Sequence, residues 1–416
     1  MPTSTVIKKL SIAVAGIATI AIAMPLSAAA ATLYSITDLG NISPTAINNR
    51  GQVVGFSVTP SGYSRAVIWE NGIITDLGTP GSNYSDSRAT DINDLGQVVG
   101  NSYNNAGRFE RAFLWDKGKM IDLGILGSND ISSQANGINN RGQVVGTILY
   151  NSSENRMGRY RGFLWENGTM TELLPGSQEN CFRSHSCYGH SALGINDAGQ
   201  VVGYSGHPMS MGSPARAFVL QNGWINDLGL YLNNYGGYWS TAKKINNAGQ
   251  VVAVTFVPYY LPLPFHNGGV FLLENCSAFP GSGQRCKVTD LGNTDGEYTS
   301  VVDINDVGQI IGPFGLWENG TVTAPNSLLP KNSGWESLSL LAINNSGQIV
   351  GSGSFHGKGR GFLMTPGFES VPEPNLALGL LAFGAFGAGA MVKRQRQGQA
   401  WAMTSITPQR SRLSGI

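Results

Sequence analysis

The sequence predicts an all-β protein, a seven-bladed β-propeller of four-stranded blades. The first observation is a motif that occurs seven times and reads Ile-Asn, Asn or Asp, any residue, Gly-Gln and a β-branched pair. Its copies begin at Ile47, Ile92, Ile138, Ile195, Ile245, Ile304 and Ile343. Their spacing of about 39 to 59 residues is close to the length of one propeller blade. The other two observations are four strand-like segments in each unit and an extra segment at the N-terminus.

The four segments are clearest in the second unit, which we label a to d in chain order. They are 89–93, 97–101, 111–115 and 120–123. Each is short, rich in Val, Ile, Phe, Leu or Trp, and bounded by Gly, Asn or Asp, residues that tolerate turn conformations. Four such strands make one propeller blade.

The turns predict which strands are paired and which links vary. Segments a and b are joined by Asn or Asp, any residue and Gly, whereas c and d are usually joined by Glu-Asn-Gly, as at 70–72. Asn-Gly permits the positive φ angles of a tight hairpin. The b-to-c and d-to-a links differ in length from unit to unit. Because neighbouring strands are antiparallel, these links are expected on one face of the ring, which we call the variable face, and the tight turns on the other.

The chain ends are expected to close the ring. A copy of the d segment, 36–40, precedes the first a segment, and the last unit stops after its c segment, 361–364. The N-terminal strand therefore fits the vacant place and removes an exposed sheet edge. A parallel β-solenoid remains an alternative, because stacked repeats also give Gly- and Asn-rich periodicity.

Composition and termini indicate export. The formal net charge of +1 gives no electrostatic argument for nucleic acid. Residues 1–31 resemble a signal peptide, with Lys8 and Lys9 before an apolar run and small residues at the end. We expect the mature chain to begin near Thr32 and the propeller to span 32–366. A retained N-terminal anchor is the alternative.

The composition changes after the last repeat. Residues 367–375 form a linker that contains Pro372, Glu373 and Pro374, residues 376–392 are an apolar run, and 393–416 form a basic tail beginning with Lys393, Arg394 and Arg396. As a helix the run would span roughly 26 Å, just short of a bilayer core. The basic residues would stay cytoplasmic, leaving the repeats outside.

Two family resemblances follow from these residues. The tail resembles the PEP-CTERM sorting signal, which implies an exosortase-type sorting enzyme as partner, cleavage near Pro-Glu-Pro and a cell-surface or extracellular destination. The further residues 398–416 depart from that pattern and leave a retained helix open. The repeats resemble the HAF-type extracellular repeat family, with Arg in place of His at Arg111-Ala112-Phe113. That resemblance implies an architecture and no catalytic residues.

Four cysteines in an exported chain predict disulfides. The expected pairs are Cys181 with Cys187 and Cys276 with Cys286, because each closes a short local loop. Cys181, His185, Cys187 and His190 have the residue types of a zinc site, which is the alternative. We predict no metal and no cofactor. The Asp91 and Asp303 turns lack the later acidic ligand of a calcium loop.

Three groups of residues are candidates for ligand contact or for the core. Arg65, Arg111, Arg161, Arg216 and Arg360 open segment c and are expected to pair with acidic side chains between blades, or else to attract acidic sugars. Trp69, Trp115, Trp165 and Trp317 are expected in the core between blades. The candidate ligand face comprises loop aromatics that suit stacking on sugars: Tyr235, Tyr238, Trp239, Tyr259 and Tyr260.

The function expected from the sequence is a non-catalytic binding or structural module associated with extracellular polysaccharide or a surface protein. The alternative is a secreted lyase or glycosidase that uses the same face. The sequence contains no Gly-x-Ser-x-Gly elbow, no His-Glu-x-x-His motif and no phosphate-binding glycine loop. No catalytic residue is therefore predicted, although scattered acidic residues can suffice for such enzymes.

Overall fold

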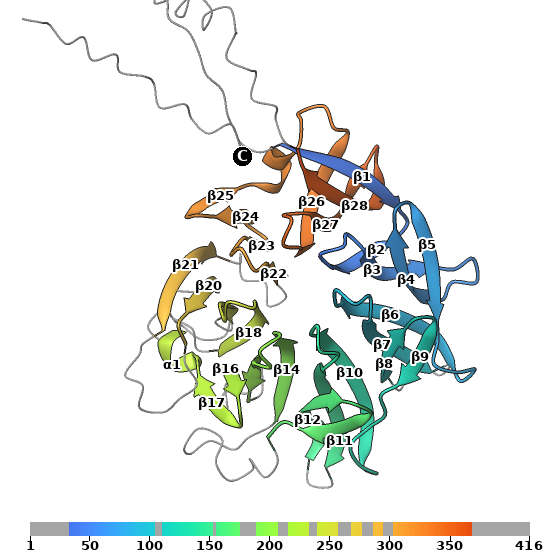
Figure 1. The fold of residues 1–416 in the computed structure, drawn as a ribbon, viewed down its shortest axis with the longest axis vertical. Coiled ribbons are helices and arrows are strands. Elements are labelled where there is room, and N and C mark those ends of the chain that lie inside the picture. Colours follow the sequence, from blue (N-terminus) through green and yellow to red (C-terminus); the bar gives the residue numbers. More distant parts are fainter. Residues whose placement is uncertain are drawn as a thin grey trace, which may run out of the picture. The chain divides into compact units, whose positions relative to one another are not determined.

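The computed structural model describes residues 33–104, 110–152, 155–174, 189–206, 215–232, 239–256, 268–276, 286–293 and 303–367. These residues form seven four-stranded antiparallel sheets. Figure 1 shows the sheets arranged as blades around a common centre. The predicted seven-bladed propeller is confirmed.

The first four blades follow the order a, b, c, d from the centre outward. Blade 1 contains β2 (Ser43–Ile47), β3 (Val53–Val58), β4 (Ser64–Glu70) and β5 (Ile73–Gly78). Blade 2 contains β6 (Tyr84–Ile92), β7 (Val98–Asn104), β8 (Glu110–Asp116) and β9 (Lys119–Asp122). Blade 3 contains β10 (Asp130–Ile138), β11 (Val144–Ser152), β12 (Asn155–Glu166) and β13 (Thr169–Glu172). Blade 4 contains β14 (His190–Ile195), β15 (Val201–Ser205), β16 (Arg216–Gln221) and β17 (Trp224–Asp227).

The remaining blades complete the ring. Blade 5 contains β18 (Trp239–Ile245), β19 (Val251–Phe256), β20 (Gly269–Glu274) and β21 (Lys287–Asn293). Blade 6 contains β22 (Asp303–Ile304), β23 (Ile310–Gly312), β24 (Gly315–Glu318) and β25 (Thr321–Thr323). Blade 7 contains β26 (Trp335–Ile343), β27 (Ile349–Phe355), β28 (Lys358–Pro366) and, outermost, β1 (Tyr34–Gly40). Two short helical turns, α1 (Gly229–Leu232) and η2 (Pro325–Leu328), follow β17 and β25.

The closure of the ring by the chain ends is confirmed. Strand β1 pairs antiparallel with β28, in a register that places Tyr34 opposite Pro366 and Asp38 opposite Phe362. Tyr34 and Leu39 are buried by this pairing. Every strand pairing in the seven sheets is antiparallel, which excludes the parallel solenoid for the described residues.

The tight turns have the backbone angles that their residues predict. In the first c-to-d turn Asn71 and Gly72 have φ of 50° and 86°, as a type I′ hairpin requires. In the first a-to-b turn only Gly51 is left-handed, with φ of 77°, and the backbone N–H of Gly51 donates to the oxygen of Asn48 at 3.0 Å. The strands are longer than predicted on the variable side, where blade 3 extends furthest.

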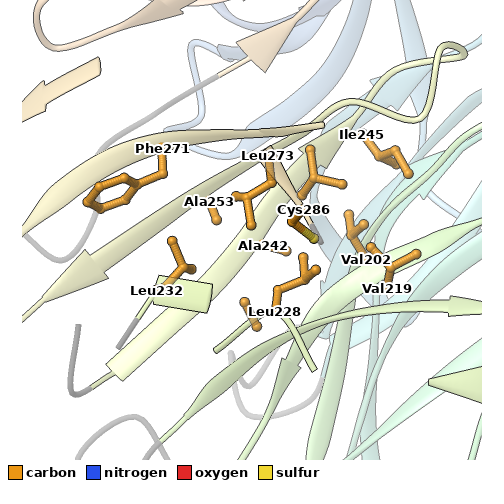
Figure 2. Close-up of a cluster of buried hydrophobic side chains, with 12 residues drawn as sticks. Val202, Val219, Leu228, Leu232, Ala242, Ile245, Ala253, Phe271, Leu273 and Cys286 are labelled. Atoms are coloured by element: carbon orange, nitrogen blue, oxygen red, sulfur yellow. The ribbon is translucent and has the colours of Figure 1, made fainter. Parts of the chain in front are cut away.

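The hydrophobic core consists of layers between neighbouring blades. Val54 and Ile68 of blade 1 pack with Ala89 and Phe113 of blade 2. Figure 2 shows the layer between blades 4 and 5, including Val202, Val219, Ala253 and Leu273. The four segment-c tryptophans are half-buried against such layers, as expected: Trp69, Trp115, Trp165 and Trp317. Burial between blades is what holds each sheet to the next.

Several predicted features lie outside the described residues. These are the signal peptide at 1–31, most of the linker at 367–375, the apolar run at 376–392 and the basic tail at 393–416. Within the described part of the chain, no helix is both long enough and apolar enough to cross a bilayer.

Candidate functional site

The repeated motif builds a hydrogen-bonded a-to-b turn at the inner edge of each blade. In blade 1 the Asn48 side-chain oxygen accepts from the backbone N–H groups of Arg50 and Gln52, at 3.1 and 3.0 Å. The Asn48 amide donates to the Gln52 side-chain oxygen at 2.7 Å. The motif Asn and Gln are therefore required because each satisfies buried polar groups of the turn.

The motif asparagines also join every blade to the next. Each Asn amide donates to the backbone oxygen of the corresponding Asn in the following blade at 2.9 to 3.0 Å. We call this circle the latch ring. Its members are Asn48, Asn93, Asn139, Asn196, Asn246, Asn305 and Asn344. The last bond, from Asn344 to Asn48, closes the circle.

The next residue of the motif forms a second circle, the Asx ring, in which asparagine and aspartate alternate. Its members are Asn49, Asp94, Asn140, Asp197, Asn247, Asp306 and Asn345. Each backbone N–H donates to the side-chain Oδ1 of the following member at 2.8 to 2.9 Å. Each aspartate Oδ2 also accepts from the amides of both flanking asparagines, at 2.8 to 3.3 Å. Neutral donors thus separate the three negative charges.

The Asx ring surrounds an axial chamber of about 160 Å³. In five blades the residue before the motif Ile lines this chamber, and in three of them that residue is charged: Asp91, Lys244 and Asp303. The Lys244 amine lies 4.0 Å from the Asp303 carboxylate. Asp91 accepts backbone hydrogen bonds from Ile92 and Ile138, both at 3.0 Å. Asp303 accepts one from Ile343 at 3.0 Å.

The electrostatics of the chamber keep its lysine charged. Burial alone would lower the pKa of the Lys244 amine, but the carboxylates of Asp91 and Asp303 outweigh it, and the pKa is raised. Burial raises the pKa of the Asp303 carboxyl, against the lowering effect of Lys244 and of backbone N–H groups. A protonated lysine is a poor nucleophile or base, and both carboxylates already accept backbone hydrogen bonds. The chamber therefore resembles a structural centre more than a proton-transfer site.

Three of the five segment-c arginines pair with acidic residues within their own blade, so for these three the expected pairing between blades is wrong. Arg216 contacts Asp227 at 2.8 Å and Arg360 lies 3.9 Å from Asp38. Arg161 pairs with Asp130 and Glu172 of its own sheet. In all three blades an acidic partner lies opposite the residue two positions after the arginine, as Asp227 lies opposite Phe218. Residues at that spacing share a face of the sheet, which explains the pairing.

The variable face carries a second cavity where blade 7 meets blade 1. This seam groove has a volume of about 550 Å³. Its lining includes Ser43, Ser337, Ser352, Ser354 and Arg360, together with several glycines. Ser43 and Ser337 are exposed, whereas Ser352, Ser354 and Arg360 are half-buried. The groove is therefore an open site, with both polar and apolar surface, on the face expected to carry the ligand site.

The candidate ligand face is placed only in part. Tyr235, Tyr238, Tyr259 and Tyr260 lie outside the described residues. Trp239 is 2% exposed and belongs to a cluster with Ala215 and Tyr204. Its ring is therefore buried and is not available to stack on a ligand at the surface. Trp239 is the first residue of β18 and not part of the preceding link. Its side chain accordingly packs between blades.

The cysteine prediction is also placed in part. Cys276 and Cys286 form a disulfide that closes the enlarged hairpin between β20 and β21. Cys181 and Cys187 lie outside the described residues, as do the sorting residues Pro372, Glu373, Pro374, Lys393, Arg394 and Arg396. The described part of the chain contains no cluster of three or more His, Cys, Asp or Glu suited to a metal ion.

The axial charges and the seam groove were not predicted from the sequence. The alternation of Asn and Asp in the Asx ring is visible in the seven motif copies. That these residues form a hydrogen-bonded ring becomes evident only when the seven copies are placed around one axis. No local sequence pattern predicts the groove. It arises where small residues such as Ser352 stand at positions that carry large residues such as Phe56 in another blade, and these positions can be matched only from the pairing register of the strands.

Comparison with known families gives one match. Residues 63–175 match the model of a family described as a protein of unknown function (DUF3466). This region covers the outer part of blade 1, blade 2 and blade 3. A comparison with curated proteins found no match.

Solved structures similar to this chain share very low sequence identity with it. One is the β-propeller domain of the Trilobed protease from Pyrococcus furiosus, 9% identical, with a TM-score of 0.40, covering 79% of each chain. Another is the polysaccharide lyase Uly1, 8% identical, with a TM-score of 0.43, covering 80% of this chain and 99% of the other. A third is a lectin of Aleuria aurantia, 11% identical, with a TM-score of 0.31, covering 82% and 97%.

Proposed function

We propose that this chain is an exported, surface-sorted propeller that acts as a non-catalytic binding module in extracellular polysaccharide. The observation that carries the proposal is the difference between the two faces. The tight-turn face is closed by the latch ring and the Asx ring, whose polar groups bond to one another. The variable face carries unequal links and the seam groove. A binding function therefore belongs to the variable face.

The non-catalytic part of the proposal rests on the axial carboxylates. Asp91 and Asp303 line the axial chamber, and both accept backbone hydrogen bonds. General acid and base catalysis needs carboxyl groups whose proton is available to a substrate. Groups engaged in holding adjacent blades are poorly suited to that task.

Export and sorting rest on the sequence alone. Residues 1–31 supply the export signal, and Pro372, Glu373 and Pro374 with the following apolar run supply the resemblance to a sorting signal. Fractionation of the producing cells tests this part. We expect the protein at the surface or in the medium, with its N-terminus near Thr32. Confinement to the cytoplasm would contradict the proposal.

The binding function is tested by titrating the purified exported protein with extracellular polysaccharide of the producing cells. Heat of binding and newly formed reducing ends are followed in the same samples. Saturable binding without new reducing ends is the expected result. Reducing ends that accumulate with time would establish a polysaccharide-degrading enzyme instead. Absence of both signals would exclude a polysaccharide ligand and leave a protein partner or a structural coat.

A further inference from the structure

The seam groove lies at a seam that lacks a stack of side chains present at the neighbouring seam. Between blades 1 and 2, the guanidinium of Arg88 lies 4.6 Å above the ring of Phe56. Phe56 is on β3, opposite Ala66 of β4, and Arg88 is on β6, opposite Asn101 of β7. The stack fills the variable-face end of that seam.

The pairing register identifies the equivalent positions between blades 7 and 1. Ser352 lies opposite Gly361, as Phe56 lies opposite Ala66. Ser43 lies opposite Phe56, as Arg88 lies opposite Asn101. A phenylalanine and an arginine are thus replaced by two serines, and both serines line the groove.

The links at this seam leave the groove uncovered. Strands β1 and β2 are joined by residues 41–42, and β27 and β28 by residues 356–357. The corresponding links at the next seam span residues 79–83 and 59–63. The strand that borders the groove is also distorted, because Ser337 has a left-handed φ of 52° at an irregularity of β26. Left-handed serine in a strand is energetically unfavourable and is typical of functional sites.

Arg360 is the charged residue of the groove lining, and its ion pair with Asp38 is longer than that of Arg216 with Asp227. Its guanidinium lies 3.9 Å from the Asp38 carboxylate, whereas Arg216 contacts Asp227 at 2.8 Å. No other ion pair or side-chain hydrogen bond of Arg360 is formed among the described residues. Its planar group can therefore donate two parallel hydrogen bonds to a carboxylate that enters the groove.

We propose that the seam groove binds a uronate unit of an acidic polysaccharide, with the sugar ring in the space of the missing stack and its carboxylate on Arg360. The serine hydroxyls offer donors and acceptors for the sugar hydroxyls, and the glycines let the ligand approach the backbone. This inference rests on the proposed function, because it names the ligand class and the place of binding. A pyranose ring suits the site because it has an apolar face and a polar edge.

The test uses the full exported protein and four defined hexasaccharides: mannuronate, galacturonate, glucose and mannose. Affinities are measured by calorimetry at fixed ionic strength, since charge contacts depend on salt. We expect at least one uronate hexamer to bind at least 10-fold more tightly than either neutral hexamer. Arg360→Gln should remove this preference by weakening uronate binding about 10- to 100-fold, the range for hydrogen bonds to a charged group. Arg360→Lys should restore it only in part.

A second variant tests the groove itself. The double substitution Ser43→Arg and Ser352→Phe copies the stack between blades 1 and 2, so it should fill the groove without unfolding the ring. Its thermal midpoint is measured first. The control is Ser346→Arg, an exposed position in the tight-turn face where two other blades carry Arg50 and Arg141. We expect the double variant to lose uronate binding and the control to keep it.

The outcomes separate this inference from the proposed function. Equal affinity for uronate and neutral hexamers would overturn the uronate assignment. Unchanged uronate binding by the folded double variant would overturn the groove as the site, although glycan binding would stand. Absence of binding to native polysaccharide and to all four hexamers would overturn both. If the double variant fails to fold, the ratio of affinities in Arg360→Gln decides the matter.

Discussion

His190 is a buried histidine whose surroundings keep it uncharged. It is 4% exposed and lies at the first position of β14, in the layer between blades 3 and 4. Its pKa is lowered to about 4, chiefly by burial and also by the nearby Arg161 guanidinium, while a hydrogen bond with the Gly162 backbone acts in the opposite direction. In three other blades the equivalent residue is a serine that accepts a backbone N–H of the preceding blade, as Ser87 does from Ala66.

The lowered pKa of His190 predicts a loss of stability in acid. The unfolded chain binds a proton below about pH 6.5, whereas the folded chain does so only below about pH 4. The free energy of unfolding should therefore fall as the pH drops through this window, by about 3 kcal/mol at pH 4. His190→Ser should reduce this decrease, as measured by urea unfolding at a series of pH values. His356→Gln is the control, because His356 is exposed. Parallel pH profiles for the protein and His190→Ser would contradict the prediction.

Strand β1 is the element on which closure of the ring depends. It contributes the buried side chains Tyr34 and Leu39 and covers the edge of β28, which would otherwise present unpaired backbone groups. Burial of two such side chains is worth about 3 to 6 kcal/mol. The backbone N–H of Gly40 donates to the Asp38 carboxylate at 2.7 Å, and this bond fixes the turn into β2.

Removal of β1 should destabilise the whole ring. A chain that begins at Asn41 is compared with one that begins at Thr32, by thermal unfolding and by light scattering. We expect the shorter chain to unfold at lower temperature and to associate through its exposed edge. A peptide of residues 33–41 should restore the midpoint, and the same peptide with Leu39→Asp should not. Identical midpoints for the two chains would show that β1 is dispensable.

At the scale of elements the sequence predicted more than it did at the scale of the site. Turn residues such as Asn71 and Gly72 determine hairpins locally, so strand number and blade closure could be inferred. Trp239 was assigned to the link, but it is the first residue of strand β18. A shift of one residue in the strand boundary therefore moves its side chain from the exposed link into the packing between blades. The groove required a comparison of Ser352 with Phe56, which depends on the register across two sheets. Such long-range correspondences have no local sequence signal.

The whole ring is held by two circles of hydrogen bonds that cross every seam. Seven members cannot alternate perfectly between asparagine and aspartate, so one pair of like residues must occur. That pair is Asn345 and Asn49, at the seam closed by β1. Asn140 donates to two aspartates, Asp94 and Asp197, whereas Asn49 donates to Asp94 alone. The ring therefore has interior positions and seam positions that differ in their number of charged neighbours.

This difference predicts an order of stability among four substitutions of the same kind. Asn140→Asp and Asn247→Asp each remove two amide hydrogen bonds to aspartates and add a charge beside two aspartates. Asn49→Asp and Asn345→Asp each remove one such hydrogen bond and add a charge beside one aspartate. At about 1 to 2 kcal/mol for each lost bond and its repulsion, the first two should cost about 2 to 4 kcal/mol and the others about half. Urea unfolding at pH 7 and low salt measures these costs, and added salt should reduce them. Equal costs at all four positions would mean that charge alternation does not stabilise the ring.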